Sequence, residues 1–230
     1  MSEDLATIAT GTSLVPGWFG KIPSLGDFAV RRLPPEFTDV WDAWLAESLS
    51  ASQEQLGEAW RTAYLRAPIW RFALTPGIVD ERFWFGVLMP SVDRVGRHFP
   101  LTIAVPSEAL PRPSLDPLEA WYERVSAAAL GCLSAESSVE AFEEKLAGLA
   151  PLAFGASASR VHTDETQLRI DAAHGIDAAG ADLAREALLR DLALMSFWWA
   201  RFDTSVAPSI VAMRGLPAPA SFVRLLDGSL

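Results

Sequence analysis

A short segment between two apolar runs of the chain carries residue types that serve catalysis and ion pairing. The apolar runs are Phe83–Met89 and Leu101–Val105, and the polar residues between them are Ser91, Asp93, Arg94, Arg97 and His98. Serine, aspartate and histidine are the types of a hydrolase triad, in which histidine takes the proton of the attacking serine. A real active site would place Ser91, Asp93 and His98 in one pocket, within hydrogen-bond reach. The other interpretation is that Asp93 pairs with Arg94 or Arg97 and caps a turn.

Two strands must position this segment. Both apolar runs are rich in aromatic and β-branched residues, are too short for typical helices and are bounded by proline, so we predict two buried strands. A connection that is polar and joins two core strands must run over the surface, where binding residues concentrate. We therefore expect the polar residues, with Gly96 among them, to lie on an exposed loop.

A second turn shaped by glycine and proline lies near the start of the chain. Trp18–Ile22 predicts a strand, and Pro23–Asp27, which contains Gly26, predicts a turn. This turn and the segment Pro90–Phe99 are both polar turns shaped by glycine and proline and flanked by strand-like apolar runs. We therefore expect them to lie side by side. Asp27 would then pair with Arg94 or Arg97.

Cofactor motifs fail in this chain. Gly20-Lys21 resembles part of a phosphate loop, but Ile22 stands where Ser or Thr must hold magnesium, so we expect no nucleotide. Five possible metal ligands are scattered between Pro151 and Gly180, with spacings that match no familiar site. They are His162, Asp164, Glu165, Asp171 and His174. We expect no metal and no cofactor.

The remaining pattern predicts an α/β fold. The pattern predicts one helix at Glu36–Ser50 and a second that starts at the capping box Ser52–Gln55. Later helices are expected to start at Asp116 and at Ser137–Glu140, to run from about Asp182 to Leu192, and to end the chain at the C-terminus. Further strands are expected at Ile69–Leu74, Phe197–Arg201 and Ile210–Met213. Because strands outnumber long crossovers, a doubly wound parallel sheet is disfavoured. We predict one domain over residues 1–230, with a mixed, largely antiparallel sheet, helices packed on it and a loose tail at 1–14.

The composition excludes several classes of protein. The net charge is −10 and the isoelectric point is near 4.8, which disfavours nucleic acid and anionic membranes as partners. The one cysteine, Cys132, cannot form an internal disulfide, and the chain has neither a secretory signal nor an apolar run of the ~20 residues that span a membrane. These features predict a cytoplasmic protein.

Four separated motifs resemble the TagF/ImpM family of type VI secretion system-associated proteins. They are GWFGKIPSLGDF (Gly17–Phe28), APIWRFALTP (Ala67–Pro76), GVLMPSVDRVGRHFP (Gly86–Pro100) and FWWARFDTSVAPSIVAMRGLPAP (Phe197–Pro219). The motifs occur in the family's order. The resemblance as a whole covers nearly the whole chain and is weakest between Pro151 and Gly180.

The resemblance implies a cytoplasmic, non-enzymatic accessory protein that represses the assembly or firing of the secretion machine. Family members are thought to act after translation, through the forkhead-associated scaffold protein of the same system. The resemblance carries over no catalytic residue. It implies candidate interaction or framework positions only: Lys21, Pro23, Gly26, Asp27, Ser91, Asp93, Arg94, Gly96 and Arg97. The alternative from another class is a hydrolase or phosphate-ester enzyme that uses Ser91, Asp93 and His98.

Overall fold

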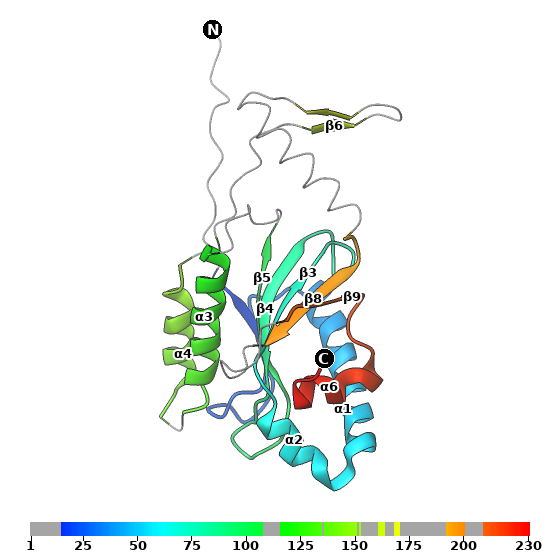
Figure 1. Cartoon of the computed structure of the whole chain (residues 1–230). Helices are drawn as coiled ribbons and strands as arrows, with labels where there is room; N and C mark the ends of the chain where they lie inside the picture. Colours follow the sequence, from blue (N-terminus) through cyan, green and yellow to red (C-terminus); the bar gives the residue numbers. More distant parts are fainter. Residues whose placement is uncertain are drawn as a thin grey trace.

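Seven antiparallel strands form the central sheet of the protein. The computed structural model describes residues 15–107, 116–134, 136–150, 152, 161–163, 168–170, 192–200 and 209–230. The sheet has the order β2-β1-β5-β4-β3-β8-β9, and every pairing in it is antiparallel (Figure 1). Its strands are β1 (Gly17–Gly20), β2 (Ala29–Arg31), β3 (Trp70–Leu74), β4 (Phe83–Met89), β5 (Leu101–Ser107), β8 (Met195–Ala200) and β9 (Val211–Arg214). A separate hairpin joins β6 (Val161–Thr163) and β7 (Leu168–Ile170).

The two strands predicted from the apolar runs are the centre of the sheet. All seven residues of β4 are buried, and so are six of the seven residues of β5. β4 pairs with β5 from Phe83 opposite Ser107 to Met89 opposite Leu101. This register places the connection Pro90–Pro100 at one end of the sheet, close to the end of β1, which pairs with the other side of β5.

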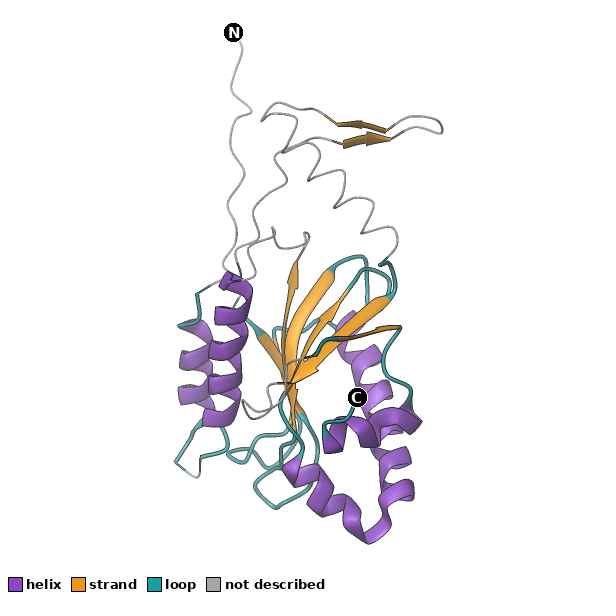
Figure 2. Ribbon diagram, in the orientation of Figure 1, coloured by secondary structure: helices purple, strands orange, loops and turns teal. Residues whose placement is uncertain are grey.

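Helices cover both faces of the sheet (Figure 2). One face carries α1 (Pro35–Leu56), α2 (Trp60–Arg66) and α6 (Phe222–Asp227), together with the short turns η1 (Gly57–Ala59) and η2 (Pro219–Ser221). The other face carries α3 (Asp116–Gly131) and α4 (Val139–Ala147). This three-layer arrangement confirms the predicted α/β fold with an antiparallel sheet and helices packed on it.

Buried tryptophans dominate the core, and their N–H groups are hydrogen-bonded. The Trp41 ring packs against the rings of Trp44, Phe72 and Trp198 between α1 and the sheet, and its centroid lies 4.8 to 6.2 Å from theirs. Their indole partners are Thr102 Oγ for Trp41, the Pro217 carbonyl for Trp44 and Ser196 Oγ for Trp198. An indole buried without such a partner would carry a desolvation cost, so these bonds let the aromatic residues fill the core.

One helix boundary was predicted wrongly. The pattern Ser52–Gln55 suggested the start of a new helix, but α1 continues through it and ends at Leu56. The Ser52 hydroxyl does not cap a helix: it donates to the Leu49 carbonyl at 2.8 Å and accepts from Trp60 Nε1 at 2.8 Å. The break comes at Gly57, whose φ of +51° is costly for other residues.

The other predicted elements in the described residues agree with the structure, with small shifts in their ends. Ser138 is the N-cap of α4 and accepts from the Ala141 backbone N–H at 3.1 Å, and Gly148 follows its last residue. Strand β2 was not predicted. The expected tail at 1–14, the helix from Asp182 and the possible ligands Asp164, Glu165, Asp171 and His174 lie outside the described residues, and the side chain of His162 does too.

Candidate interaction site

The connection between β4 and β5 is a tight turn built around Asp93. The Gly96 N–H donates to the Asp93 carbonyl at 2.9 Å, and the Asp93 N–H donates to the Arg97 carbonyl at 3.1 Å. Gly96 has a φ of +85°, a conformation that glycine adopts without the strain of a side chain. Val92 and His98 form an isolated antiparallel bridge below the turn. The polar segment is therefore a folded extension of the β4–β5 hairpin.

One buried carboxylate holds this turn together. Asp93 Oδ1 accepts from the backbone N–H groups of Val95 at 3.0 Å and Arg97 at 2.9 Å, and Asp93 Oδ2 accepts from Arg97 Nε at 2.6 Å and lies 3.1 Å from Lys21 Nζ. Burial opposes ionisation of this carboxyl. The hydrogen bonds from Arg97, Lys21 and Val95 outweigh burial and hold the pKa of Asp93 well below its ordinary value. We call Lys21, Asp93 and Arg97 the loop clamp.

The loop clamp joins this turn to the turn after β1, which was predicted to lie beside it. Pro23 lies at the second position of a β-turn closed by the bond from the Leu25 N–H to the Ile22 carbonyl, 3.0 Å long. The Arg94 N–H then donates to the Leu25 carbonyl at 2.9 Å, and Arg97 Nη2 donates to the Gly26 carbonyl at 2.5 Å. The two predicted loops therefore lie side by side. We call these segments, 21–28 and 90–100, the loop platform.

Two glycines, Gly26 in the platform and Gly20 at the end of β1, allow this close approach. A Cβ on Gly26 would lie 3.2 Å from Arg94 Nη2, which packs over the glycine. A Cβ on Gly20, whose φ is +128°, would lie 2.0 Å from the Pro100 carbonyl oxygen. A side chain at Gly20 is therefore excluded, because the clashing atom is backbone.

The predicted ion pair between Asp27 and Arg97 is long and exposed. Arg97 Nη2 lies 3.9 Å from Asp27 Oδ1, at the limit of an ion pair, and both side chains are exposed. Exposed pairs of this kind contribute about 0–1 kcal/mol. The stronger partner of Arg97 is Asp93, so the interpretation in which Asp93 pairs with Arg97 and caps the turn describes the geometry.

Around the clamp, the platform presents exposed apolar side chains and an exposed arginine together. Val95, at the tip of the turn, is 70% exposed, and Phe28 is 46% exposed. The Phe28 ring contacts the Phe99 ring edge-on at 4.5 Å, and Lys21 Nζ lies 4.7 Å from its centroid. Arg94 is exposed, and its guanidinium makes no ion pair with the described residues. Sequence reasoning missed Val95 and Phe28, because an exposed apolar residue looks like a core residue in sequence.

Ser91, Asp93 and His98 do not form a catalytic arrangement. Among the described residues, the buried Ser91 Oγ has no hydrogen-bond partner, and the Asp93 carboxylate is occupied by the clamp. The His98 ring lies edge-on to Trp60 at 5.5 Å and to Tyr64 at 5.3 Å. Burial, with the positive charges of Arg61 and Lys21, lowers the pKa of His98. The geometry expected of a hydrolase triad is not met.

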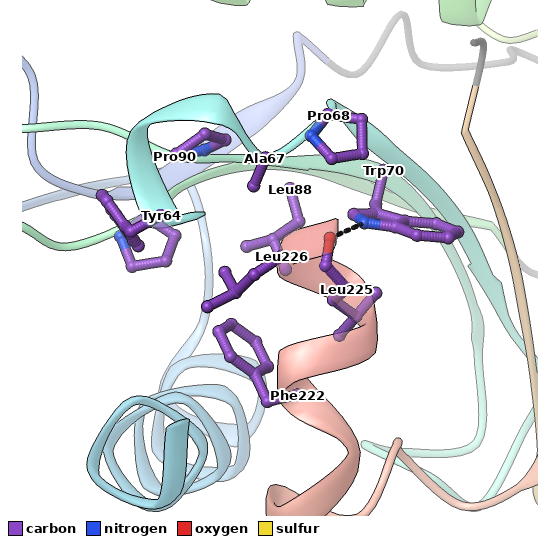
Figure 3. A pocket seen from close by; sticks show the side chains of 10 residues that line it. Tyr64, Ala67, Pro68, Trp70, Leu88, Pro90, Phe222, Leu225 and Leu226 are labelled. Carbon is purple, nitrogen blue, oxygen red and sulfur yellow. Dashed lines mark hydrogen bonds between the residues drawn. The ribbon is translucent and has the colours of Figure 1, made fainter. Parts of the chain in front are cut away.

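A small apolar pocket lies beside the platform, between α2, α6 and the sheet (Figure 3). Its volume is about 20 Å³, little more than one water needs. The polar groups at its wall are occupied: the Trp70 indole donates to the Leu225 carbonyl at 2.8 Å, and the Tyr64 hydroxyl donates to the Ser91 carbonyl at 2.9 Å and accepts from its N–H at 3.0 Å. The pocket is a packing defect, too small for a substrate.

Metal-binding clusters are not found within the described part of the chain: no group of three or more His, Cys, Asp and Glu side chains there is suited to hold an ion. In the same residues, no helix combines the length and the apolar character that crossing a membrane needs. Cys132 is buried in the core against α3, and burial raises the pKa of its thiol to about 12, so it is a small apolar residue there.

A second charge cluster, which sequence reasoning missed, joins the sheet to α3. Arg71 on β3 is buried, and its guanidinium donates to Glu119 Oε1 at 2.6 Å and to Glu123 Oε1 at 2.8 Å. Burial disfavours the charged form of Arg71, but the two carboxylates outweigh it and raise the pKa of Arg71. Beside them, the Tyr122 hydroxyl donates to the Phe72 carbonyl at 2.5 Å. We call Arg71, Glu119 and Glu123 the helix clamp.

Comparison with known proteins agrees with the motifs. Residues 17–149 match the family described as the TagF N-terminal domain, type VI secretion system-associated. A solved structure, that of PA0076 from Pseudomonas aeruginosa PAO1, is 37% identical, with a TM-score of 0.73, over 93% of this chain and 94% of that one. No curated protein matches the chain. The chain belongs to the type VI secretion system-associated family defined by the TagF N-terminal domain.

Proposed function

We propose that this protein is a cytoplasmic, non-enzymatic repressor that acts after translation on a bacterial type VI secretion system. It acts as one domain that binds a component of the machine, the forkhead-associated scaffold protein being the first candidate, and occupies a surface needed for assembly. The loop platform is the binding surface. Family membership supports the association with the secretion system, and the platform's geometry supports binding over catalysis.

The main observation behind the proposal is that one buried side chain of the platform fixes the turn, while other side chains of the same turn face solvent. The buried Asp93 accepts four hydrogen bonds or ion contacts, so the backbone of the turn is fixed from inside. Arg94 and Val95, at the outer positions of the same turn, are left exposed. A surface that is rigid before binding loses less conformational entropy when it binds. Arginine and aromatic residues are also enriched among the residues that contribute most to binding.

The test is the double variant Arg94→Ala/Arg97→Ala in cells that carry the secretion cluster. We expect secretion of the machine's own components to rise to the level of a strain that lacks this protein. The purified variant should bind the scaffold more weakly by about 2 kcal/mol or more, the cost typical of truncating such residues. Its melting temperature should stay within about 4 °C of the parent, because Asp93 keeps Lys21 and two backbone donors.

The matched control is Arg124→Ala/Arg214→Ala, which removes two exposed arginines from α3 and β9. This control should repress and bind like the parent. If the platform variant folds, binds and represses normally, the platform is framework and the proposal of this surface is wrong. If deletion of the whole protein leaves secretion unchanged, the proposed repressor function is wrong.

A further inference from the structure

The chemistry of the platform restricts what its partner can present. Three cations meet there, Lys21, Arg94 and Arg97, against two carboxylates, Asp27 and Asp93. Asp93 and Lys21 are both buried in the loop clamp and pair with each other, so the charged side chains of the platform that face solvent are Arg94, Arg97 and Asp27. Arg94 has no ion pair among the described residues, and Arg97 is 55% exposed although it is bound to Asp93. The platform is therefore locally positive on a chain whose net charge is −10.

A further cation lies next to this surface. Arg61 is exposed on α2, and its neighbour Trp60 contacts the ring of His98 at 5.5 Å. Arg61 forms no ion pair with the residues that the structure describes. Together with Arg94 and Arg97 it gives three arginines that are exposed on this side of the molecule. Guanidinium groups bind carboxylates in pairs of parallel hydrogen bonds, with directional preference.

Apolar side chains lie among these cations. Val95 stands at the tip between Arg94 and Gly96, and Phe28 lies against Lys21 and Phe99. Phe28 is the outermost ring of a cluster in which Phe19 and Phe99 are buried. A polyanion such as a nucleic acid would gain little from these apolar groups and would be repelled by the rest of the acidic chain. A protein segment can satisfy both kinds of group at once.

We infer that the platform binds an acidic segment of a partner protein, in which two or more carboxylates flank a bulky apolar side chain. The carboxylates pair with Arg94, Arg97 and Arg61, and the apolar side chain packs on Val95 and Phe28. This inference rests on the proposed function, because it names the chemistry of the partner that the same surface binds. A second copy of this chain and a nucleic acid are the competing occupants.

The test places a photo-reactive phenylalanine analogue at Val95 of the full chain, in cells that carry the secretion cluster. Val95 is a suitable site because it is 70% exposed at the tip of the turn. Mass spectrometry then identifies the cross-linked peptide. We expect a peptide from a component of the secretion machine with at least two Asp or Glu within about five residues of an apolar one. The same analogue at the exposed Leu130 of α3 is the control, and it should not capture this peptide.

A charge swap with the partner identified in this way tests the pairing. Arg94→Glu should weaken binding at least tenfold, and a Glu→Arg change in the captured segment should restore at least half of the loss. Raising the salt concentration from 50 to 300 mM should weaken the parent complex severalfold and the Arg94→Glu complex less, because fewer ion pairs remain to be screened. Phe28→Ser, which keeps every charge, should weaken binding without changing the salt dependence.

Other outcomes separate the two proposals. A cross-linked secretion component whose peptide lacks carboxylates overturns the acidic-segment inference and leaves the proposed function standing. A cross-link to nucleic acid, or to a second copy of this chain, also overturns the inference. If Leu130 captures a secretion component and Val95 captures none, the partner binds elsewhere and both the surface and the inference are wrong. If no position captures a secretion component, the proposed function is wrong, together with the proposed surface and the acidic-segment inference.

Discussion

The loop clamp and the helix clamp share one design, a buried central charge held between two charges of the opposite sign. The central charge is negative in the loop clamp and positive in the helix clamp. In the loop clamp a carboxylate, Asp93, is fully buried between two cations. In the helix clamp a guanidinium, Arg71, is buried between two carboxylates that are 54% and 42% exposed. Each central charge is removed from water and kept ionised by its partners. The clamps differ in how accessible those partners are and in what they join.

This difference assigns the two clamps different tasks. The loop clamp includes a buried cation, Lys21, and two backbone N–H groups, so the conformation of a whole turn depends on one carboxylate. The helix clamp consists of side-chain contacts, and Glu119 and Glu123 are both partly exposed to water. We therefore expect the loop clamp to be the more costly of the two to break, and the helix clamp to adjust.

The largest effect should follow from Asp93→Asn. The amide keeps the size of the side chain but removes its charge, which leaves the buried Lys21 ammonium without a counter-charge. Removing one member of a buried pair is far more costly than removing both. We expect the melting temperature to fall by roughly 15 °C, measured by circular dichroism.

Asp27→Asn is the matched control for that prediction. It makes the same change in the same platform, at a side chain that is exposed and 3.9 Å from its cation. It should shift the melting temperature by no more than about 2 °C. Equal shifts for the two variants would contradict the idea that the buried carboxylate organises the turn.

The same comparison explains what could be predicted from sequence. Asp93 and Arg97 are four residues apart, and Asp, Gly and Pro have known turn preferences. The pairing of Asp93 with Arg97 across a turn at Gly96 could therefore be predicted from the sequence. Arg71 and Glu119 are 48 residues apart, and only the packing of α3 on the sheet brings them together. The apolar runs predicted β4 and β5 because both strands are fully covered, whereas β2, at the edge of the sheet, has too little buried surface to give a pattern.

The next largest effect tests the helix clamp from both sides. Glu119→Gln/Glu123→Gln leaves Arg71 buried with neutral partners, and should lower the melting temperature by about 6 °C. Arg71→Met removes the buried charge itself and leaves two carboxylates that water can solvate, so it should cost no more than about 3 °C. A larger loss for Arg71→Met than for the double variant would show that the cluster contributes through the packing of the Arg71 side chain and not through its charge.

Acid should reduce the difference between the parent and Asp93→Asn. The pKa of Asp93 is depressed in the folded protein, so as the pH falls the unfolded chain binds the proton first. The stabilisation by Asp93 is therefore present above the ordinary aspartate pKa of about 3.9, and is lost progressively as the pH falls below that value towards the folded-state pKa. Urea midpoints of the two proteins should differ most at pH 6 and approach each other at pH 3. A gap that stays constant over this range would mean that Asp93 does not act through its charge.

Apart from the Asp27→Asn control, the smallest effect on stability is expected for Arg97→Lys, and this variant separates the two roles of the loop clamp. Lysine keeps the positive charge beside Asp93 but lacks the planar group that reaches Asp93 Oδ2 and the Gly26 carbonyl together. Because Arg97 is more than half exposed, and Lys21 and two backbone donors remain on Asp93, the melting temperature should fall by only about 2 °C. Binding to the proposed scaffold partner should weaken much more, about tenfold, because the replacement cannot bind a carboxylate with two parallel hydrogen bonds. Isothermal titration of the parent and the variant, beside their thermal unfolding, measures both quantities on the same samples. Equal losses in stability and affinity would mean that Arg97 serves the turn alone, and the exposed side of the loop clamp would then have no binding role.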